Sequence, residues 1–272
     1  MEILIPVLVC FGIAVVCAVI LTVANALFGV KEDEKFLAIR DALPGANCGA
    51  CGYSGCDGYA RALSEGKITS TNLCVPGGAA AANDIASALG VEAEAVVKKV
   101  AYVSCNGSCE ATDKREKGWG ANATTCKEAA LVWEGEGVCL NACIGLGDCA
   151  AACPENAIVL KDGVAKVISS DCLGCGICAK TCPHGVIRIV KAENSIAVGC
   201  SNHDKGAITR KMCKNGCIGC MKCVKTCPNG AISMDNNLAV IDYEKCTGCG
   251  ACAEACPVKV IHSDSFICEK CV

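Results

Sequence analysis

Cysteine density constrains this chain more than any other feature of its sequence. Of 272 residues, 29 are cysteines, and many of them stand in C-x2-C runs, several of which end in Cys-Pro. Free thiols are reactive, so a chemical role has to explain so many of them. Disulfide scaffolds are typical of short secreted chains, and structural zinc sites use two C-x2-C pairs. Four successive cysteines followed by proline are instead typical of iron–sulfur clusters.

The cysteines also repeat along the chain at an interval of 74 residues, the distance from Cys126 to Cys200. The repeat predicts two tandem modules, at 126–199 and 200–272, each with two cysteine runs around a short strand pair. Nine cysteine pairs match at this interval: Cys126/Cys200, Cys139/Cys213, Cys143/Cys217, Cys149/Cys223, Cys153/Cys227, Cys172/Cys246, Cys175/Cys249, Cys178/Cys252 and Cys182/Cys256.

Each module resembles a bacterial two-cluster ferredoxin. In that fold, three cysteines of one run bind one cluster, and the fourth binds the other cluster. The resemblance implies complete ligand sets for three [4Fe–4S] clusters. These sets are Cys217, Cys220, Cys223 and Cys256; Cys246, Cys249, Cys252 and Cys227; and Cys172, Cys175, Cys178 and Cys153.

One ligand set of the first module is incomplete, because Leu146 stands where the repeat places Cys220. Leucine cannot bind iron. Four outcomes stay open: a [3Fe–4S] cluster, a ligand recruited from Cys139, a carboxylate ligand from Asp148, or no cluster. The cysteines that remain in this set are Cys143, Cys149 and Cys182.

A separate cysteine group precedes the repeat, with the spacing C-x2-C-x4-C-x17-C. Four thiolates in one compact segment suit a further [4Fe–4S] cluster, and zinc is the alternative for this group. The glycines around it let backbone amides approach the sulfur atoms. Its members are Cys48, Cys51, Cys56 and Cys74.

Apart from Cys10 and Cys17 in the apolar N-terminal segment, eight further cysteines lie outside these sets. They allow two more groups of four, and they equally allow free buried thiols. The sequence therefore predicts at least four and up to about seven clusters, one of them a candidate for [3Fe–4S]. The first additional group would be Cys105, Cys109, Cys126 and Cys139, and the second Cys200, Cys213, Cys268 and Cys271.

The N-terminal segment predicts a single membrane anchor. No charged residue occurs from Ile3 to Phe28, and this length can cross a hydrocarbon core of about 30 Å. A cleaved signal peptide is the alternative, but no basic residue precedes the apolar stretch. Lys31, Lys35 and Arg40 follow it, so the positive-inside rule places the bulk of the chain in the cytoplasm.

The sequence as a whole predicts an α+β chain of five parts. These are a transmembrane anchor at 1–30, a small helical and loop cluster domain at 31–90, a linker with candidate extra ligands at 91–125, and the two modules. A short amphipathic helix is expected between Gly90 and Tyr102. The formal net charge of −3 gives no indication of a nucleic-acid partner.

The order of these parts resembles the B subunit of the Rnf complex, the ion-translocating ferredoxin:NAD oxidoreductase of bacterial membranes. The most specific stretch is Leu43–Gly52, which follows the anchor as in that family. The stretches at 145–149 and 201–206 resemble its multi-cluster members.

The resemblance implies a single-pass subunit of the bacterial cell membrane. It would take electrons from soluble ferredoxin and pass them to the other subunits of the complex. No catalytic side chain is predicted, and no G-x-G-x-x-G fingerprint follows a strand, so NAD chemistry would belong to partners. The alternative is an iron–sulfur subunit of a membrane hydrogenase or anaerobic reductase.

Overall fold

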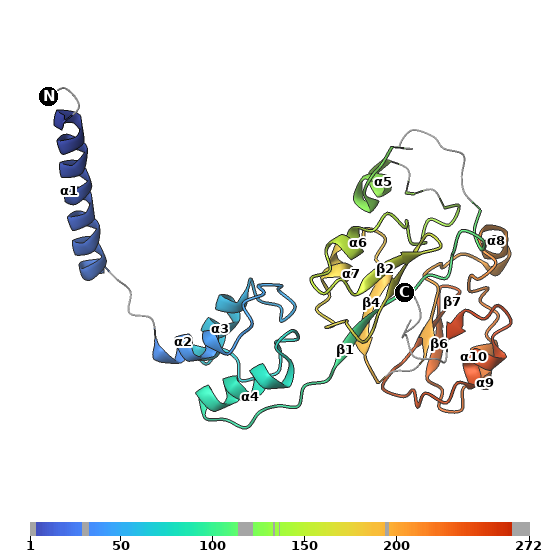
Figure 1. Cartoon of the computed structure of the whole chain (residues 1–272). Coiled ribbons are helices and arrows are strands. Elements are labelled where there is room, and N and C mark those ends of the chain that lie inside the picture. Colours follow the sequence, from blue (N-terminus) through green and yellow to red (C-terminus); the bar gives the residue numbers. More distant parts are fainter. Residues whose placement is uncertain are drawn as a thin grey trace.

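The computed structural model contains an N-terminal helix, a small helical domain and two cysteine-rich modules, in that chain order (Figure 1). The first helix, α1, runs from Leu4 to Phe28. Within the described part of the chain, no helix is identified as long and apolar enough to cross a membrane. The structure describes residues 4–28, 33–113, 122–132, 134–135, 137–193 and 196–262.

Three helices build the small domain: α2 (Glu34–Asp41), α3 (Cys56–Ser64) and α4 (Gly78–Leu89). The side chain of Asp33 accepts a hydrogen bond from the Lys35 amide, which caps the start of α2. Each helix turns apolar residues inward, and α2 contacts both of the others. The large side chains of the shared core are those of Ile39, Leu43, Tyr59, Leu63 and Ile85.

The first module is built from two antiparallel strand pairs. The outer pair joins β1 (Lys99–Val103) to β4 (Ile187–Lys191), and the hairpin joins β2 (Ile158–Lys161) to β3 (Val164–Val167). The cysteine loops lie between these strands and lead into short helices. These helices are α5 (Cys126–Val132), α6 (Asp148–Ala151) and α7 (Ile177–Thr181).

The second module repeats this plan. Its outer pair joins β5 (Ala197–Val198) to β8 (Ile261–His262), and its hairpin joins β6 (Ile232–Asp235) to β7 (Leu238–Ile241). The core lies between the hairpin and the cysteine loops. The helices of this module are α8 (Gly206–Met212), α9 (Lys222–Thr226) and α10 (Ala251–Ala255).

The prediction of a short helix between Gly90 and Tyr102 is wrong, because the end of this segment is strand β1. Val100, Ala101 and Tyr102 are all buried, and Ala101 pairs with Ile189 in β4. Pairing with a strand almost ninety residues later overrides the local helical pattern. The segment predicted as a linker therefore supplies one strand of the first module.

The contact between Gly174 and β1 gives a first testable prediction. Gly174 adopts a left-handed φ of +69°, and a Cβ added there would overlap the carbonyl group of Lys99. Gly174→Ala should therefore destabilise the first module by about 3 kcal/mol. The measurement is the guanidinium concentration at which visible cluster absorption is lost under anaerobic conditions.

Gly185→Ala is the matched control for this substitution. Gly185 has a similar φ of +61°, but nothing lies within 4 Å of a Cβ added there. Gly185→Ala therefore measures the backbone strain alone, without the clash. This strain costs about 1 kcal/mol. Equal losses in the two variants would show that the approach to Lys99 contributes nothing.

Candidate metal centres

The cysteines of the structure are thiols that gather into groups. Every cysteine from Cys17 to Cys256 is free, so none of them belongs to a disulfide scaffold. Within the described ranges, no three side chains of His, Cys, Asp or Glu form a group that could hold a single metal ion. The groups described below are sets of four thiols arranged around small cavities or in one core.

The first group lies in the small helical domain and has the four members that the spacing predicts. Burial raises the pKa of the Cys74 thiol, and its neighbours Cys56, Cys51 and Cys48 raise it further. Cys56 begins α3, and its amide donates a 2.8 Å hydrogen bond to the side chain of Asn47. Helix packing thus fixes the loop that carries these thiols.

The first module brings together Cys153, Cys172, Cys175 and Cys178, which line one cavity. Burial raises the pKa of Cys178 to about 11, and the other three thiols raise it further. Strand β1 forms part of the wall, because the amide of Ala101 donates to Sγ of Cys172 at 3.4 Å. Cys153 comes from the other cysteine run, as the ferredoxin pattern predicts for the fourth ligand.

The second module contains both groups that the resemblance to two-cluster ferredoxins implies. Burial raises the pKa of Cys223 to about 11, and the thiols that add to this effect come from both of its cysteine runs. The members of this group are Cys217, Cys220, Cys223 and Cys256. The other group lines a cavity and consists of Cys227, Cys246, Cys249 and Cys252.

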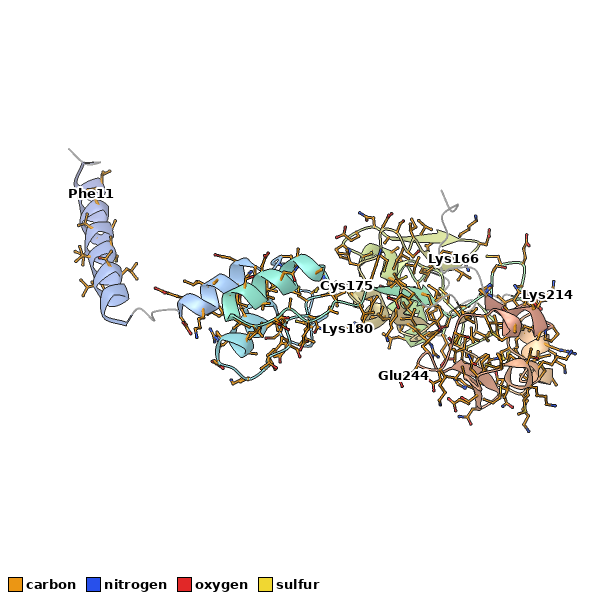
Figure 2. The ribbon with its side chains drawn as sticks, turned by 90° about the horizontal axis from the view of Figure 1, so that it is seen from below. Phe11, Lys166, Cys175, Lys180, Lys214 and Glu244 are labelled. Atoms are coloured by element: carbon orange, nitrogen blue, oxygen red, sulfur yellow. The ribbon has the colours of Figure 1, made fainter. Side chains whose placement is uncertain are left out.

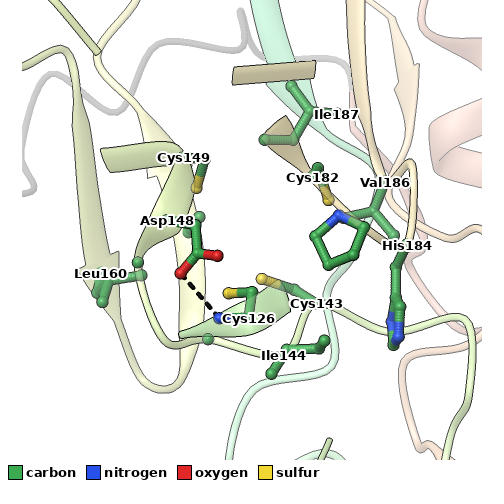
Figure 3. Close-up of a pocket in the computed structure, with 14 residues that line it drawn as sticks. Cys126, Cys143, Ile144, Asp148, Cys149, Leu160, Cys182, His184, Val186 and Ile187 are labelled. Atoms are coloured by element: carbon green, nitrogen blue, oxygen red, sulfur yellow. Dashed lines mark hydrogen bonds between the residues drawn. The ribbon is translucent and has the colours of Figure 1, made fainter. Parts of the chain in front are cut away.

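The incomplete set of the first module gains a fourth thiol, that of Cys126. Cys126, Cys143, Cys149 and Cys182 line one cavity, and in Figure 3 their sulfur atoms face a common space. Burial raises the pKa of Cys149 to about 11, and Cys126 is the thiol that adds most to this shift. Leu146 is 40 % exposed and does not line the cavity. None of the four possibilities left open by the sequence included Cys126 as the fourth ligand.

Asp148 has a positioning role at this site. Its carboxylate accepts hydrogen bonds from the amides of Cys126, at 2.8 Å, and Lys127, at 3.0 Å (Figure 3 shows the first). These are the first two amides of α5, which have no partner inside the helix, and a carboxylate there also complements the helix dipole. Asp148 therefore holds the turn that presents the Cys126 thiol.

This role predicts different outcomes for two substitutions of Asp148. Asp148→Ala removes both acceptors, at a cost of about 1 kcal/mol for a lost helix cap, and should loosen Cys126 enough to give a partial [3Fe–4S] signal. Asp148→Asn keeps one acceptor oxygen and should give a smaller signal. The measurement is electron paramagnetic resonance of the oxidised protein. A wild-type spectrum for Asp148→Ala would contradict the positioning role.

The structure also corrects the alignment of the two modules at their first cysteines. The interval of 74 residues matches Cys126 with Cys200, whereas the fold makes Cys105 the equivalent of Cys200. Sγ of Cys105 accepts from Gly107 and Cys143 at 3.4 Å, and Sγ of Cys200 accepts from Asn202 at 3.4 Å and Cys217 at 3.3 Å. The sequence signal for this equivalence is that Cys105 and Cys200 each follow a short apolar strand, β1 or β5.

The two additional groups predicted for the remaining cysteines are not the ones that the structure forms. Cys126 joins the incomplete set, and Cys139 lies near Cys105, Cys200 and Cys213. Cys109 is exposed and lines none of these cavities. The remaining predicted members, Cys268 and Cys271, lie outside the described residues.

The groups fit [4Fe–4S] clusters by the chemistry of their donors. Four soft thiols surround each space, with apolar side chains between them. Backbone amides donate to the sulfur atoms, as Gly174 does to Cys172 at 3.4 Å and Ala231 to Cys227 at 3.3 Å. Such donors stabilise negative charge on the sulfurs of a bound cluster.

Comparisons with known families agree with these groups. Residues 137–186 and 216–260 match a "4Fe-4S dicluster domain" family, residues 171–232 match another family of the same description, and residues 43–76 match a "Putative Fe-S cluster" family.

Three relatives cover most of the chain. The B subunit of the Na(+)-translocating ferredoxin:NAD(+) oxidoreductase complex of Acetobacterium woodii is 40 % identical over 90 % of this chain and 73 % of its own length. The proton-translocating counterpart of Clostridium ljungdahlii is 38 % identical over 85 % of this chain and 81 % of its own length. The B subunit of the ion-translocating oxidoreductase complex of Methanosarcina acetivorans is 38 % identical over 86 % of this chain and 88 % of its own length. The chain binds several 4Fe–4S clusters, and it belongs to the family of B subunits of the ion-translocating oxidoreductase (Rnf) complexes.

Proposed function

We propose that this chain is a one-electron relay, which takes electrons from reduced ferredoxin and passes them to partner subunits in the membrane. The observation that carries the proposal is the contact between the small domain and the first module. Nζ of Lys180 donates to the carbonyl oxygen of Gly49 at 3.2 Å, and Figure 2 places Lys180 and Cys175 at this junction. Burial raises the pKa of Cys175, and the thiol of Cys48 raises it further.

The thiol groups continue in series from that junction. Cys178, in the same group as Cys175, raises the pKa of Cys149 in the neighbouring group, where burial is the larger cause. A bound [4Fe–4S] cluster supplies reversible one-electron transfer. The chain's own part is to hold neighbouring groups close together, exclude water from the thiols and direct amides at the sulfurs.

We assign NAD chemistry and ion movement to partner subunits. The first two relatives above are named for different ions, Na+ and protons, although this chain resembles them to nearly the same extent. The sequence has no dinucleotide fingerprint. Membership of the Rnf family also disfavours the alternative of a hydrogenase or anaerobic reductase subunit.

The relay is tested by mixing the oxidised chain with reduced ferredoxin under anaerobic conditions. We expect bleaching of the visible cluster absorption within one stopped-flow trace, and no NADH when NAD is added to the chain alone. Clusters that are bleached by dithionite but not by reduced ferredoxin would contradict the proposal.

We further propose that residues 1–30 anchor the chain in the cell membrane, with the bulk of the chain in the cytoplasm. The support is the sequence, which has no charge from Ile3 to Phe28 and has Lys31, Lys35 and Arg40 directly after it.

Expression of the chain without partner subunits tests the anchor. The full chain should stay in the membrane pellet after a carbonate wash, and a variant without residues 1–30 should move to the soluble fraction. Val15→Lys with Val16→Lys should also release it, because charges at the centre of a span are costly. Release of the full chain by carbonate would contradict an integral anchor.

A further inference from the structure

Four cysteines that belong to none of the groups above meet between the two modules. Cys105, Cys139, Cys200 and Cys213 are all less than 10 % exposed and line one cavity. Burial raises the pKa of Cys139 to about 11, and Cys200, Cys105 and Cys213 raise it further. The four thiols are therefore mutual neighbours around one space.

Each module contributes an equivalent pair of these thiols. Cys105 follows β1 and Cys200 follows β5, the outer strand at the start of each module. Cys139 and Cys213 each stand four residues before the first cysteine of their module's run, Cys143 or Cys217. The cavity thus receives the same two positions from both modules, and neither module completes it alone.

The walls of the cavity are held together by hydrogen bonds that cross the module boundary. The side chain of Asn141 donates to Asn202 at 3.0 Å, and the side chain of Ser201 donates to the carbonyl oxygen of Ser104 at 2.9 Å. Asn202 is 2 % exposed and also donates to Thr209 at 3.2 Å. These contacts fix the positions of the thiols from both sides.

The site is also bonded to the neighbouring group in each module. Sγ of Cys105 accepts from the amide of Cys143, and Sγ of Cys200 accepts from the amide of Cys217. Cys143 and Cys217 are members of the four-thiol groups on either side. Backbone amides thus donate to two of the four sulfurs, the environment that a thiolate-bound cluster requires.

We propose that Cys105, Cys139, Cys200 and Cys213 hold an additional [4Fe–4S] cluster that bridges the two modules. Its purpose rests on the relay function proposed above, whereas its presence does not. The bridging cluster would let one electron pass between a cluster held by the group that contains Cys143 and a cluster held by the group that contains Cys217. The donor site is oxidised and the acceptor site reduced at each step, with no bond made or broken.

The experiment uses the full chain, reconstituted anaerobically with ferrous iron and sulfide. Cys139→Ala and Cys213→Ala each remove one thiol, one from each module, and Cys109→Ala is the control because Cys109 is exposed and outside the group. We expect each of the first two variants to lose up to about four irons per chain or to gain a three-iron signal, with the control unchanged.

The readouts separate loss of the bridging site from loss of the fold. Circular dichroism and the spectra of the other clusters should stay as in the wild type. Wild-type iron content in both variants would overturn the proposal, and so would one zinc per chain that disappears in both. A full loss of iron in either variant would mean that the fold is lost, and the double variant Cys105→Ser with Cys200→Ser then decides by the same iron count.

The outcomes also distinguish this inference from the proposed relay. If the variants lose the expected iron but ferredoxin fails to reduce the wild type, the relay fails and the bridging cluster stands. If ferredoxin reduces the wild type and the iron content of the variants is unchanged, the bridging cluster fails and the relay stands.

Discussion

Replacing Cys126 with alanine should convert one four-iron cluster of the first module into a three-iron cluster. Cys126 is the fourth thiol around the cavity that Cys143, Cys149 and Cys182 also line. Without it one corner iron has no protein ligand and is lost under oxidising conditions. We expect about one iron fewer per chain and a [3Fe–4S] signal of about one spin per chain in the oxidised protein.

Two further variants make this result specific. Cys109→Ala removes an exposed thiol nearby in sequence and should leave the spectrum unchanged. Leu146→Cys, added to Cys126→Ala, restores a thiol where the second module has Cys220 and should reduce the three-iron signal. An unchanged spectrum in Cys126→Ala would contradict the assignment, and a [3Fe–4S] signal in the wild type would do the same.

Removal of iron should unfold most of the second module. Metal-binding free energy contributes directly to folding when the ligands form the core. Aromatic residues make up only 4 % of the chain, so aromatic side chains contribute little to these cores. Cysteines fill the corresponding places in the buried cluster of this module, namely Cys200, Cys217, Cys223, Cys252 and Cys256.

Hydrogen exchange measures this effect segment by segment. After removal of iron by an oxidant and a chelator, amides of β6 and β7 should exchange at the rate of an unfolded chain, at least 100-fold faster than before, a change of about 2.7 kcal/mol. Helices α3 and α4 should retain more protection, because Ile39, Tyr59 and Ile85 form part of their core. Addition of iron and sulfide should restore the original pattern. Retained protection in β6 and β7 would contradict a core that depends on clusters.

Much of the metal chemistry could be predicted from the sequence because most ligands of a group lie within one short loop. The C-x2-C spacing of Cys172, Cys175 and Cys178 fixes their position on one turn. The distant fourth ligand, Cys153, follows from the ferredoxin pattern. The spacing of the Cys48 group and the resemblance of the modules to ferredoxins together therefore predicted four groups of thiols that the structure contains.

The remaining groups depend on contacts between distant segments, which spacing does not encode. Residues 106–138 form a longer connection than their counterpart at 201–212, so a fixed interval misaligned Cys126 with Cys200. Asp148, an alternative ligand by sequence, accepts hydrogen bonds from the turn that carries Cys126. The same limitation explains β1, where pairing with β4 decided the structure.

A Mössbauer spectrum of the full chain, loaded with iron-57 and combined with an iron count, tests the central claim most directly. Among the described residues, six groups of four thiols are present, so the account predicts about 24 irons per chain, all in [4Fe–4S] clusters and all reducible one electron at a time. About 16 irons, a three-iron component in the wild type, or zinc in place of iron would contradict it.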